Sequence, residues 1–174
     1  MGLFGHCAMG LTAKRLAPEV PLVVLLFAAE ILDVFAVAFG WAAIEGGTSG
    51  IPWSHGLFMS VVWSAVAGLG VGYVCRSSRA GVVVGLVVFS HWVLDLISHP
   101  IPFDSFSWHR WQWSYGHPLA PDLPLLFAGS PKVGLGLYNR ISALEATVLE
   151  AVMLLVGSVA YVRYALNKKA VRQP

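Results

Sequence analysis

Charged side chains are scarce in this sequence. Aspartate, glutamate, lysine and arginine together make up 11% of the 174 residues, while 57% are hydrophobic. A soluble domain usually carries about 25% charged residues. The deficit argues against an ordinary soluble domain and indicates an integral membrane protein, with residues 1–174 forming a single membrane domain.

Cysteines and early basic residues are also few. The only cysteines are Cys7 and Cys75. They fall toward opposite membrane faces in the topology given below, so we expect no disulfide. Residues 1–5 contain no lysine or arginine, and Lys14 and Arg15 follow the first apolar residues instead of preceding them. We therefore expect no cleaved signal peptide.

Long apolar runs dominate the chain instead. Four of them are long enough to cross a hydrocarbon core of about 30 Å as helices. They cover residues 21–41, 54–75, 80–98 and 141–166. Residues 2–17 would reach only about 24 Å as a helix, so we expect a half-inserted helix there. The predicted fold is an all-α membrane bundle of four transmembrane helices plus this short amino-terminal helix.

The basic residues indicate how the bundle is oriented. Lys14 and Arg15 precede the first span, and Arg76 and Arg79 join the second to the third. The fourth span carries Arg163 near its end and is followed by a basic tail, residues 167–174. With four spans these groups share one side, which the positive-inside rule makes cytoplasmic. We therefore expect a cell (inner) membrane protein whose loop 99–139 faces outward.

Ionisable side chains interrupt the spans at a common depth. His91, Asp95 and His99 lie at i, i+4 and i+8, on one face of the third span. Lipid tolerates such groups only where they have a partner or a function. The depths implied by the spans bring polar residues of three other segments to the same outer region. The side chains expected to meet are His6, Asp33, His55, His91 and Asp95.

The chemistry of this set predicts a metal site. Imidazole and carboxylate groups suit Zn²⁺, Mn²⁺ or Fe²⁺. His91 and Asp95, one helical turn apart, can grip one ion, and two ions that share a carboxylate can activate a water. We therefore predict one or two divalent ions, with zinc favoured over manganese or iron. Taken singly, each residue has another interpretation, because a membrane histidine often only packs and a membrane aspartate can relay protons or join helices.

Three further residues are candidates for a general base, an additional ligand or a group that supports a ligand. Glu30 lies one turn before Asp33, and Glu145 enters the fourth span near its outer end. His99 continues the face of His91 but also begins a proline-rich segment, so it could equally cap the helix.

Several short motifs follow one another along the chain. They are Gly5-His6-Cys7-Ala8 with Ala13-Lys14, Leu32-Asp33, Trp53-Ser54-His55-Gly56-Leu57, Ser90-His91-Trp92-Val93-Leu94-Asp95 with His99, Pro121-Asp122-Leu123-Pro124-Leu125, and Pro131-Lys132-Val133-Gly134-Leu135-Gly136-Leu137. In this order they resemble the bacterial family described as predicted membrane-bound metal-dependent hydrolases.

That resemblance implies a multi-pass helical protein with a metal site, distantly similar to zinc-dependent phospholipase C and P1-type nucleases. It implies ligand roles for His6, Asp33, His55, His91 and Asp95. It also adds Asp122, a motif acid, to the candidates for a general base, an additional ligand or a supporting group. Residues 100–118, rich in tryptophan, form an insertion relative to the family pattern. This insertion separates His99 from Asp122, so the positions of these two residues need not match the family pattern.

The leading functional prediction is a membrane hydrolase that acts on a phosphoester or lipid-like substrate near the outer leaflet. The lipid bilayer is the expected partner, and nucleic acid is not, because no extended basic face lies outside the membrane. A transporter could use the same residues as an ion path, although the inner half of each span is nearly free of polar groups. A non-catalytic scaffold that binds partners through its tryptophan-rich loop is the third alternative.

Overall fold

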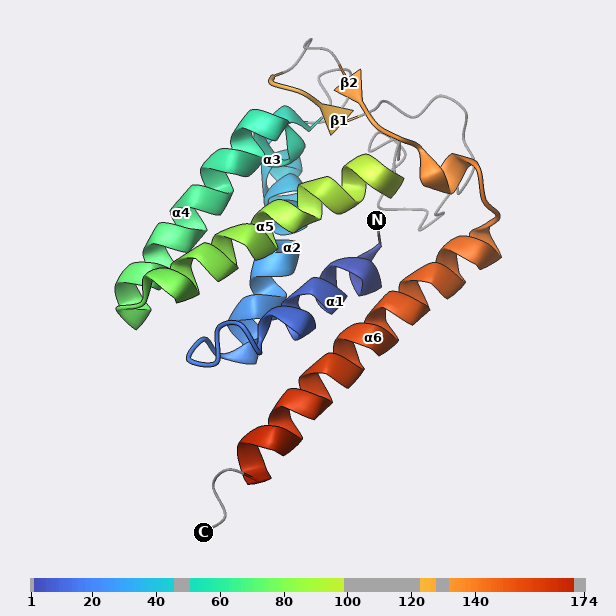
Figure 1. The fold of residues 1–174 in the computed structure, drawn as a ribbon. Helices are drawn as coiled ribbons and strands as arrows, with labels where there is room; N and C mark the ends of the chain where they lie inside the picture. Colours follow the sequence, from blue (N-terminus) through green and yellow to red (C-terminus); the bar gives the residue numbers. More distant parts are fainter. Residues whose placement is uncertain (1, 46–50, 99–122, 128–131, 171–174) are drawn as a thin grey trace.

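A computed structural model describes residues 2–45, 51–98, 123–127 and 132–170, and this part of the chain is mainly helical (Figure 1). The helices are α1 (Leu3–Ala13), α2 (Leu22–Trp41), α3 (Pro52–His55), α4 (Leu57–Cys75), α5 (Ser78–Ser98) and α6 (Ala143–Ala170), with a 3-10 turn η3 (Leu137–Asn139) before α6. Two-residue strands, β1 (Leu123–Pro124) and β2 (Lys132–Val133), pair antiparallel with Leu123 opposite Val133. The predicted all-α bundle is confirmed.

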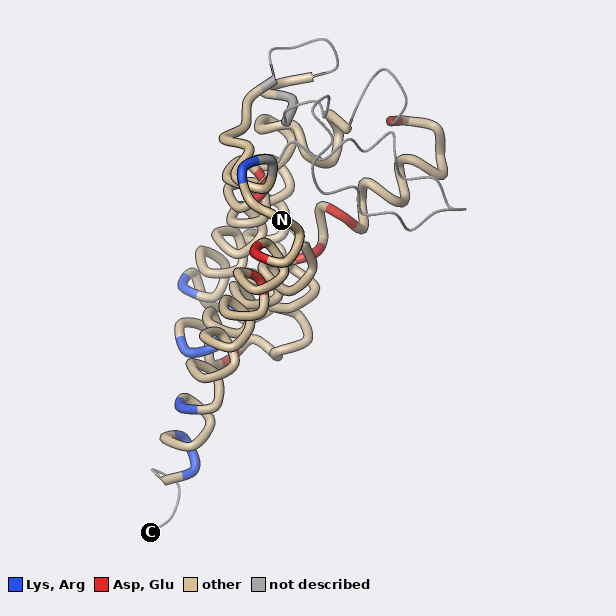
Figure 2. Tube along the Cα trace, turned by 90° about the vertical axis from the view of Figure 1, so that its right-hand side faces the viewer, with Lys and Arg blue, Asp and Glu red and all other residues tan. Residues whose placement is uncertain are grey.

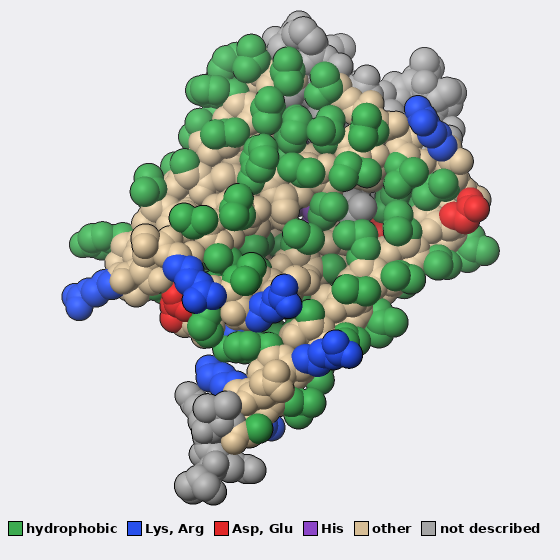
Figure 3. Space-filling model, in the orientation of Figure 1, with side chains coloured by type: hydrophobic (Ala, Val, Ile, Leu, Met, Phe, Trp, Pro, Cys, Tyr) green, Lys and Arg blue, Asp and Glu red, His purple; other side chains and the backbone are tan. Residues whose placement is uncertain are grey.

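Four helices, α2, α4, α5 and α6, are long and apolar enough to cross a membrane. Their outward faces carry large apolar side chains such as Leu69, Leu86 and Leu155, which are more than half exposed. Figure 3 shows hydrophobic side chains spread over this face of the molecule. Such a surface suits lipid, and the chain is a multi-pass membrane protein, as its composition predicts.

The second span, predicted over residues 54–75, begins later than predicted, because α4 starts at Leu57. Gly56 has an extended backbone (φ −64°, ψ 140°) that separates the four-residue helix α3 from α4. The Gly56 carbonyl accepts a hydrogen bond from the Ser60 N–H at 2.8 Å and so begins a new helix. His55 therefore belongs to a short separate helix and not to the membrane span.

Helices α4 and α5 run side by side at backbone contact distance (Figure 1). A Cβ atom on Gly81 would lie 2.6 Å from the Gly68 carbonyl oxygen, closer than real Cβ atoms approach. Small residues at this spacing let membrane helices approach closely enough for backbone contacts. The pair α4–α5 therefore forms a tight hairpin that fixes the position of the polar face of α5.

Helix α1 packs against α2, α5 and α6. A Cβ on Gly10 would lie 2.8 Å from the Leu25 carbonyl oxygen, and one on Gly157 would lie 2.8 Å from the Ala8 carbonyl oxygen. The apolar core lies between α2 and α5, with fully buried Leu32 and Val88 among its members. The short helix is therefore held within the bundle by close contacts on two sides.

Charged residues are distributed unevenly along the bundle. Figure 2 shows most basic residues toward the end where α6 finishes and most acidic residues in the other half. The loop after α1 and the turn between α4 and α5 meet at this basic end, where the Ser77 hydroxyl donates a hydrogen bond to Glu19 at 2.7 Å. Arg140, ahead of α6, is an exception. The three basic groups of the sequence thus gather at one end.

Candidate metal centre

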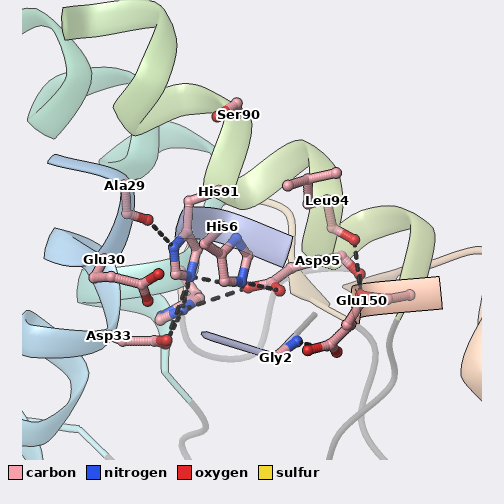
Figure 4. A network of polar contacts seen from close by, with 12 residues as sticks. Gly2, His6, Ala29, Glu30, Asp33, Ser90, His91, Leu94, Asp95 and Glu150 are labelled. Atoms are coloured by element: carbon pink, nitrogen blue, oxygen red, sulfur yellow. Dashed lines mark hydrogen bonds and ion pairs between the residues drawn. The ribbon is translucent and has the colours of Figure 1, made fainter. Parts of the chain in front are cut away.

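Five side chains from four helices meet between the helices. His6 comes from α1, Asp33 from α2, His55 from α3, and His91 and Asp95 from α5. Figure 4 shows His6, His91, Asp95 and Asp33 directed toward one another. The three histidines and Asp95 are at most 4% exposed, whereas the Asp33 side chain is 47% exposed. Asp33 therefore lies on the open side of the cluster.

Five of the six separations among four atoms of this cluster lie between 3.2 and 3.5 Å. His55 Nε2 lies 3.2 Å from both Asp33 Oδ1 and His91 Nε2, and 3.5 Å from Asp95 Oδ2. His91 Nε2 lies 3.5 Å from Asp33 Oδ1 and 3.3 Å from Asp95 Oδ2. Tetrahedral ligands at about 2.0–2.1 Å from a zinc ion are about 3.3–3.4 Å from one another. These five distances fit the ligand set of one divalent ion.

His6 lies at the edge of this set. Its Nε2 atom is 3.3 Å from Asp95 Oδ1, whereas His91 contacts the other oxygen of that carboxylate, Oδ2. Ligand atoms of His6, Asp33 and His91 also lie within 4.8 Å of one another. His6 is therefore placed to hold the Asp95 carboxylate or to bind a second ion that shares it.

The ring orientation of His91 is set by the backbone of α2. His91 Nδ1 lies 2.7 Å from the Ala29 carbonyl oxygen. A carbonyl oxygen only accepts hydrogen bonds, so Nδ1 carries the proton and donates it. Neutral His91 then presents the lone pair of Nε2 to the cluster, which is the form that binds a metal.

The ring of His55 is oriented by side chains that sequence reasoning missed. His55 Nδ1 lies 2.9 Å from Ser54 Oγ, which in turn lies 2.5 Å from Glu45 Oε1. Burial raises the pKa of the Glu45 carboxyl, and hydrogen bonds from Ser54 and Trp53 act in the opposite direction. Two signals were available in the sequence, an isolated acid beside a glycine-rich loop and a serine next to a candidate ligand.

Glu30 is the predicted auxiliary residue that the structure brings to the cluster. It lies on α2 one turn before Asp33, and Figure 4 shows its carboxylate directed toward the histidines. The Cys7 thiol donates a hydrogen bond to Glu30 Oε1 at 3.5 Å. Glu30 is half-buried, so it lies between the buried histidines and the exposed side of the site.

The structure gives Glu145 a different role. Its carboxylate accepts hydrogen bonds from the Ser142 backbone N–H at 2.7 Å and the Ser142 hydroxyl at 2.8 Å. This is a capping box at the start of α6, on an exposed turn. We therefore leave Glu145 out of the proposed site. The other two predicted residues, His99 and Asp122, and the tryptophan-rich segment lie outside the described residues.

Glu150 forms a second polar contact deep in the bundle. It is 5% exposed, and its Oε1 atom accepts hydrogen bonds from the Gly2 backbone N–H and the Tyr138 hydroxyl, both at 2.7 Å. Glu150 therefore ties α6 and η3 to the start of α1, the helix that carries His6.

Comparison with protein-family models, curated proteins and solved structures gave no significant match. The family resemblance of the motifs therefore stays a prediction. The fold and the site define a multi-pass membrane protein with a buried histidine and aspartate cluster, and its function is argued below from that geometry.

Proposed function

We propose that this protein is a membrane-embedded metal-dependent hydrolase. The observation that carries the proposal is the set of near-uniform distances among ligand atoms of His55, His91, Asp33 and Asp95. These groups would hold a divalent ion, with zinc as the first choice for this mixture of nitrogen and oxygen ligands. When bound, such an ion would supply Lewis-acid chemistry, and it would lower the pKa of a coordinated water if half-exposed Asp33 gave up its place to that water.

The chain's own residues supply the remaining requirements of hydrolysis. A general base must reach a water at the accessible side of the site. Glu30 meets this requirement, because it lies one turn from half-exposed Asp33 and points toward the histidines. We propose that Glu30 accepts the proton of the attacking water and that His6 holds the Asp95 carboxylate in place.

We propose a phosphoester, of a lipid or a lipid-like molecule, as the substrate. The supporting points are the resemblance of the motifs to metal-dependent hydrolases and an outer surface that carries many exposed large apolar side chains. The gathering of basic residues at the opposite end favours a cytoplasmic location for that end. In this orientation the cluster faces the outer leaflet of the cell membrane.

An ion path is less well supported. A path across the bilayer needs polar groups at successive depths. Among the described residues, the buried charged and histidine side chains belong to the cluster or attach to it. Glu45 attaches through Ser54, and Glu150 attaches through the start of α1.

The test uses the full-length protein purified in detergent. Wild type, His91→Ala and a control, Ser64→Ala, are loaded with zinc, dialysed and assayed for bound metal. Each is also assayed for hydrolysis of a soluble aryl phosphodiester and a short-chain phospholipid. Ser64 is a matched control because it is buried and its hydroxyl donates only to the Ser60 carbonyl of its own helix.

We expect wild type and Ser64→Ala to retain zinc and to hydrolyse at least one substrate, and His91→Ala to lose both properties. Wild-type protein that retains no divalent metal would overturn the proposal. Hydrolysis that persists unchanged in His91→Ala would do the same.

A further inference from the structure

Glu45 is an acidic residue buried outside the ligand set. It follows α2 and is 6% exposed. Its Oε2 atom accepts hydrogen bonds from the backbone N–H groups of Trp53 at 2.9 Å and Ser54 at 3.1 Å. Its Oε1 atom lies 2.5 Å from the Ser54 hydroxyl. With two backbone donors and one hydroxyl donor on it, the carboxylate acts purely as an acceptor.

In this arrangement the Ser54 hydroxyl uses its single proton in the hydrogen bond to Glu45. A serine hydroxyl donates one hydrogen bond and accepts others, and here its proton points to the Glu45 carboxylate. Ser54 is fully buried, so water does not offer it another acceptor. Toward its other neighbour, His55 Nδ1 at 2.9 Å, Ser54 Oγ can therefore only accept.

The consequence for His55 is a fixed tautomer. Because Nδ1 must donate to Ser54, neutral His55 carries its proton on Nδ1 and presents the lone pair of Nε2 to Asp33 and His91. The Ala29 carbonyl has the same effect on His91. The backbone thus orients His91, and the side chains of Glu45 and Ser54 orient His55. Both histidines present Nε2 to the same point.

We propose that Glu45 is a positioning residue that acts through Ser54 to hold His55 in its metal-binding tautomer. The inference rests on the proposed metal site. It goes beyond that site by assigning a role to two residues that do not touch the ion. Groups that orient a metal-binding histidine typically change metal affinity about 10–100-fold when they are removed.

The isosteric change Glu45→Gln is the sharpest probe, because it reverses the direction of the hydrogen bonds. The two backbone N–H groups that face Oε2 require an oxygen there, so the amide nitrogen of glutamine must occupy the position of Oε1. It then donates to Ser54 Oγ, and the Ser54 hydroxyl is left to donate to His55 Nδ1. This favours the tautomer with its proton on Nε2, which cannot bind a metal.

The experiment is a Co²⁺ titration of the full chain in detergent, followed by visible absorption. Wild type, Glu45→Gln, Ser54→Ala and the control Ser64→Ala are compared, with circular dichroism and thermal unfolding recorded for each. Ser54→Ala interrupts the same chain of hydrogen bonds but leaves the Glu45 charge in place. It tests the proposal in place of Glu45→Gln if that variant does not fold.

We expect Glu45→Gln and Ser54→Ala to raise the Kd for Co²⁺ about 10–100-fold. At saturation we expect both to give the absorption bands of wild type, because the ligands themselves are unchanged. Ser64→Ala should bind like wild type. A purely structural role would lower the melting temperature of the variants and leave the Kd of the folded protein unchanged.

Two results would overturn the inference, and they have different consequences for the proposed metal site. Wild-type Co²⁺ binding together with unchanged affinity in the folded variants overturns the role of Glu45 and leaves the metal site intact. No Co²⁺ binding by wild type overturns the metal site and, with it, the role of Glu45.

Discussion

His6 stacks face to face on His91. The ring centroids are 3.7 Å apart and the ring planes differ by 5°. The two histidines also contact opposite oxygens of Asp95, each at 3.3 Å. A residue of α1 and a residue of α5 therefore hold one carboxylate between them, which joins the short amino-terminal helix directly to the ligand set.

The first prediction concerns the contribution of the His6–Asp95 contact to zinc affinity. In His6→Ala, we expect the protein to retain one zinc ion per chain with about 10-fold weaker affinity, because Asp95 loses a neighbour that orients it. Zinc is measured by elemental analysis after dialysis against a graded competitor. Phe4→Ala, which removes a half-exposed side chain of the same helix, should bind like wild type. Complete loss of zinc in His6→Ala would show instead that His6 is a required ligand.

The second prediction concerns metal removal. A ligand that binds only the folded state stabilises it, by about 4 kcal/mol when its concentration is 1,000 times its Kd. We therefore expect a chelator to lower the melting temperature of the wild-type protein in detergent and added zinc to restore it. His91→Ala should melt at the same temperature with chelator and with zinc. A zinc-dependent shift of equal size in that variant would contradict the assignment.

The third prediction concerns the contact between α4 and α5. Gly81→Ala places a Cβ atom against the Gly68 carbonyl, whereas an added Cβ on Gly70 meets nothing within 4 Å. Overpacking at such a contact costs about 1–3 kcal/mol. We expect Gly81→Ala to lower the free energy of unfolding by that amount in a detergent denaturation assay. Gly70→Ala is the matched control and should have no comparable effect.

The fourth prediction concerns the link between α6 and α1. Glu150→Ala removes the acceptor of two buried hydrogen bonds, from the Gly2 N–H and the Tyr138 hydroxyl, and such a loss costs about 1–3 kcal/mol. Glu150→Gln keeps an oxygen that can accept both hydrogen bonds. Thermal unfolding should therefore show the larger destabilisation for Glu150→Ala. Equal melting temperatures for the two variants would mean that these hydrogen bonds do not stabilise the fold.

The fifth prediction concerns orientation. If the basic end is cytoplasmic, green fluorescent protein fused after Pro174 should fluoresce in cells. Alkaline phosphatase fused after Ser98, at the other end of α5, should be active because it reaches the outside. The opposite pair of results would reverse the topology and place the cluster toward the cytoplasm.

The sequence predicts the spans well because each is a long apolar run with few charges. It also singled out the five residues of the cluster, because ionisable side chains are conspicuous in such runs. Helical periodicity alone predicts that His91 and Asp95 lie on the same face of their helix. Their meeting with His6 depends on close packing of α1 through Gly10 and Gly157, and their meeting with His55 depends on the short helix α3 that Gly56 terminates; no single residue reveals either.

Two parts of the site were not predictable in the same way. Glu45 acts on His55 across a turn, and no helical or strand period relates residues of an irregular segment. The depth of Glu145 in the fourth span suggests a place in the site, although Ser142 three residues earlier is the signature of a capping box. Depth along a span says nothing about the face on which a side chain lies, and only the structure shows that this carboxylate caps its own helix.

The uneven exposure of the cluster has a consequence for how quickly an ion would exchange with the proposed site. His6, His55, His91 and Asp95 are closed off by the surrounding helices, whereas nearly half of the Asp33 side chain is exposed. Asp33 is the most exposed of the five residues, so an ion bound at the proposed site would exchange most readily past this side chain. Occupancy in a cell would then depend on residence time as much as on affinity, and a single exposed carboxylate would set that time.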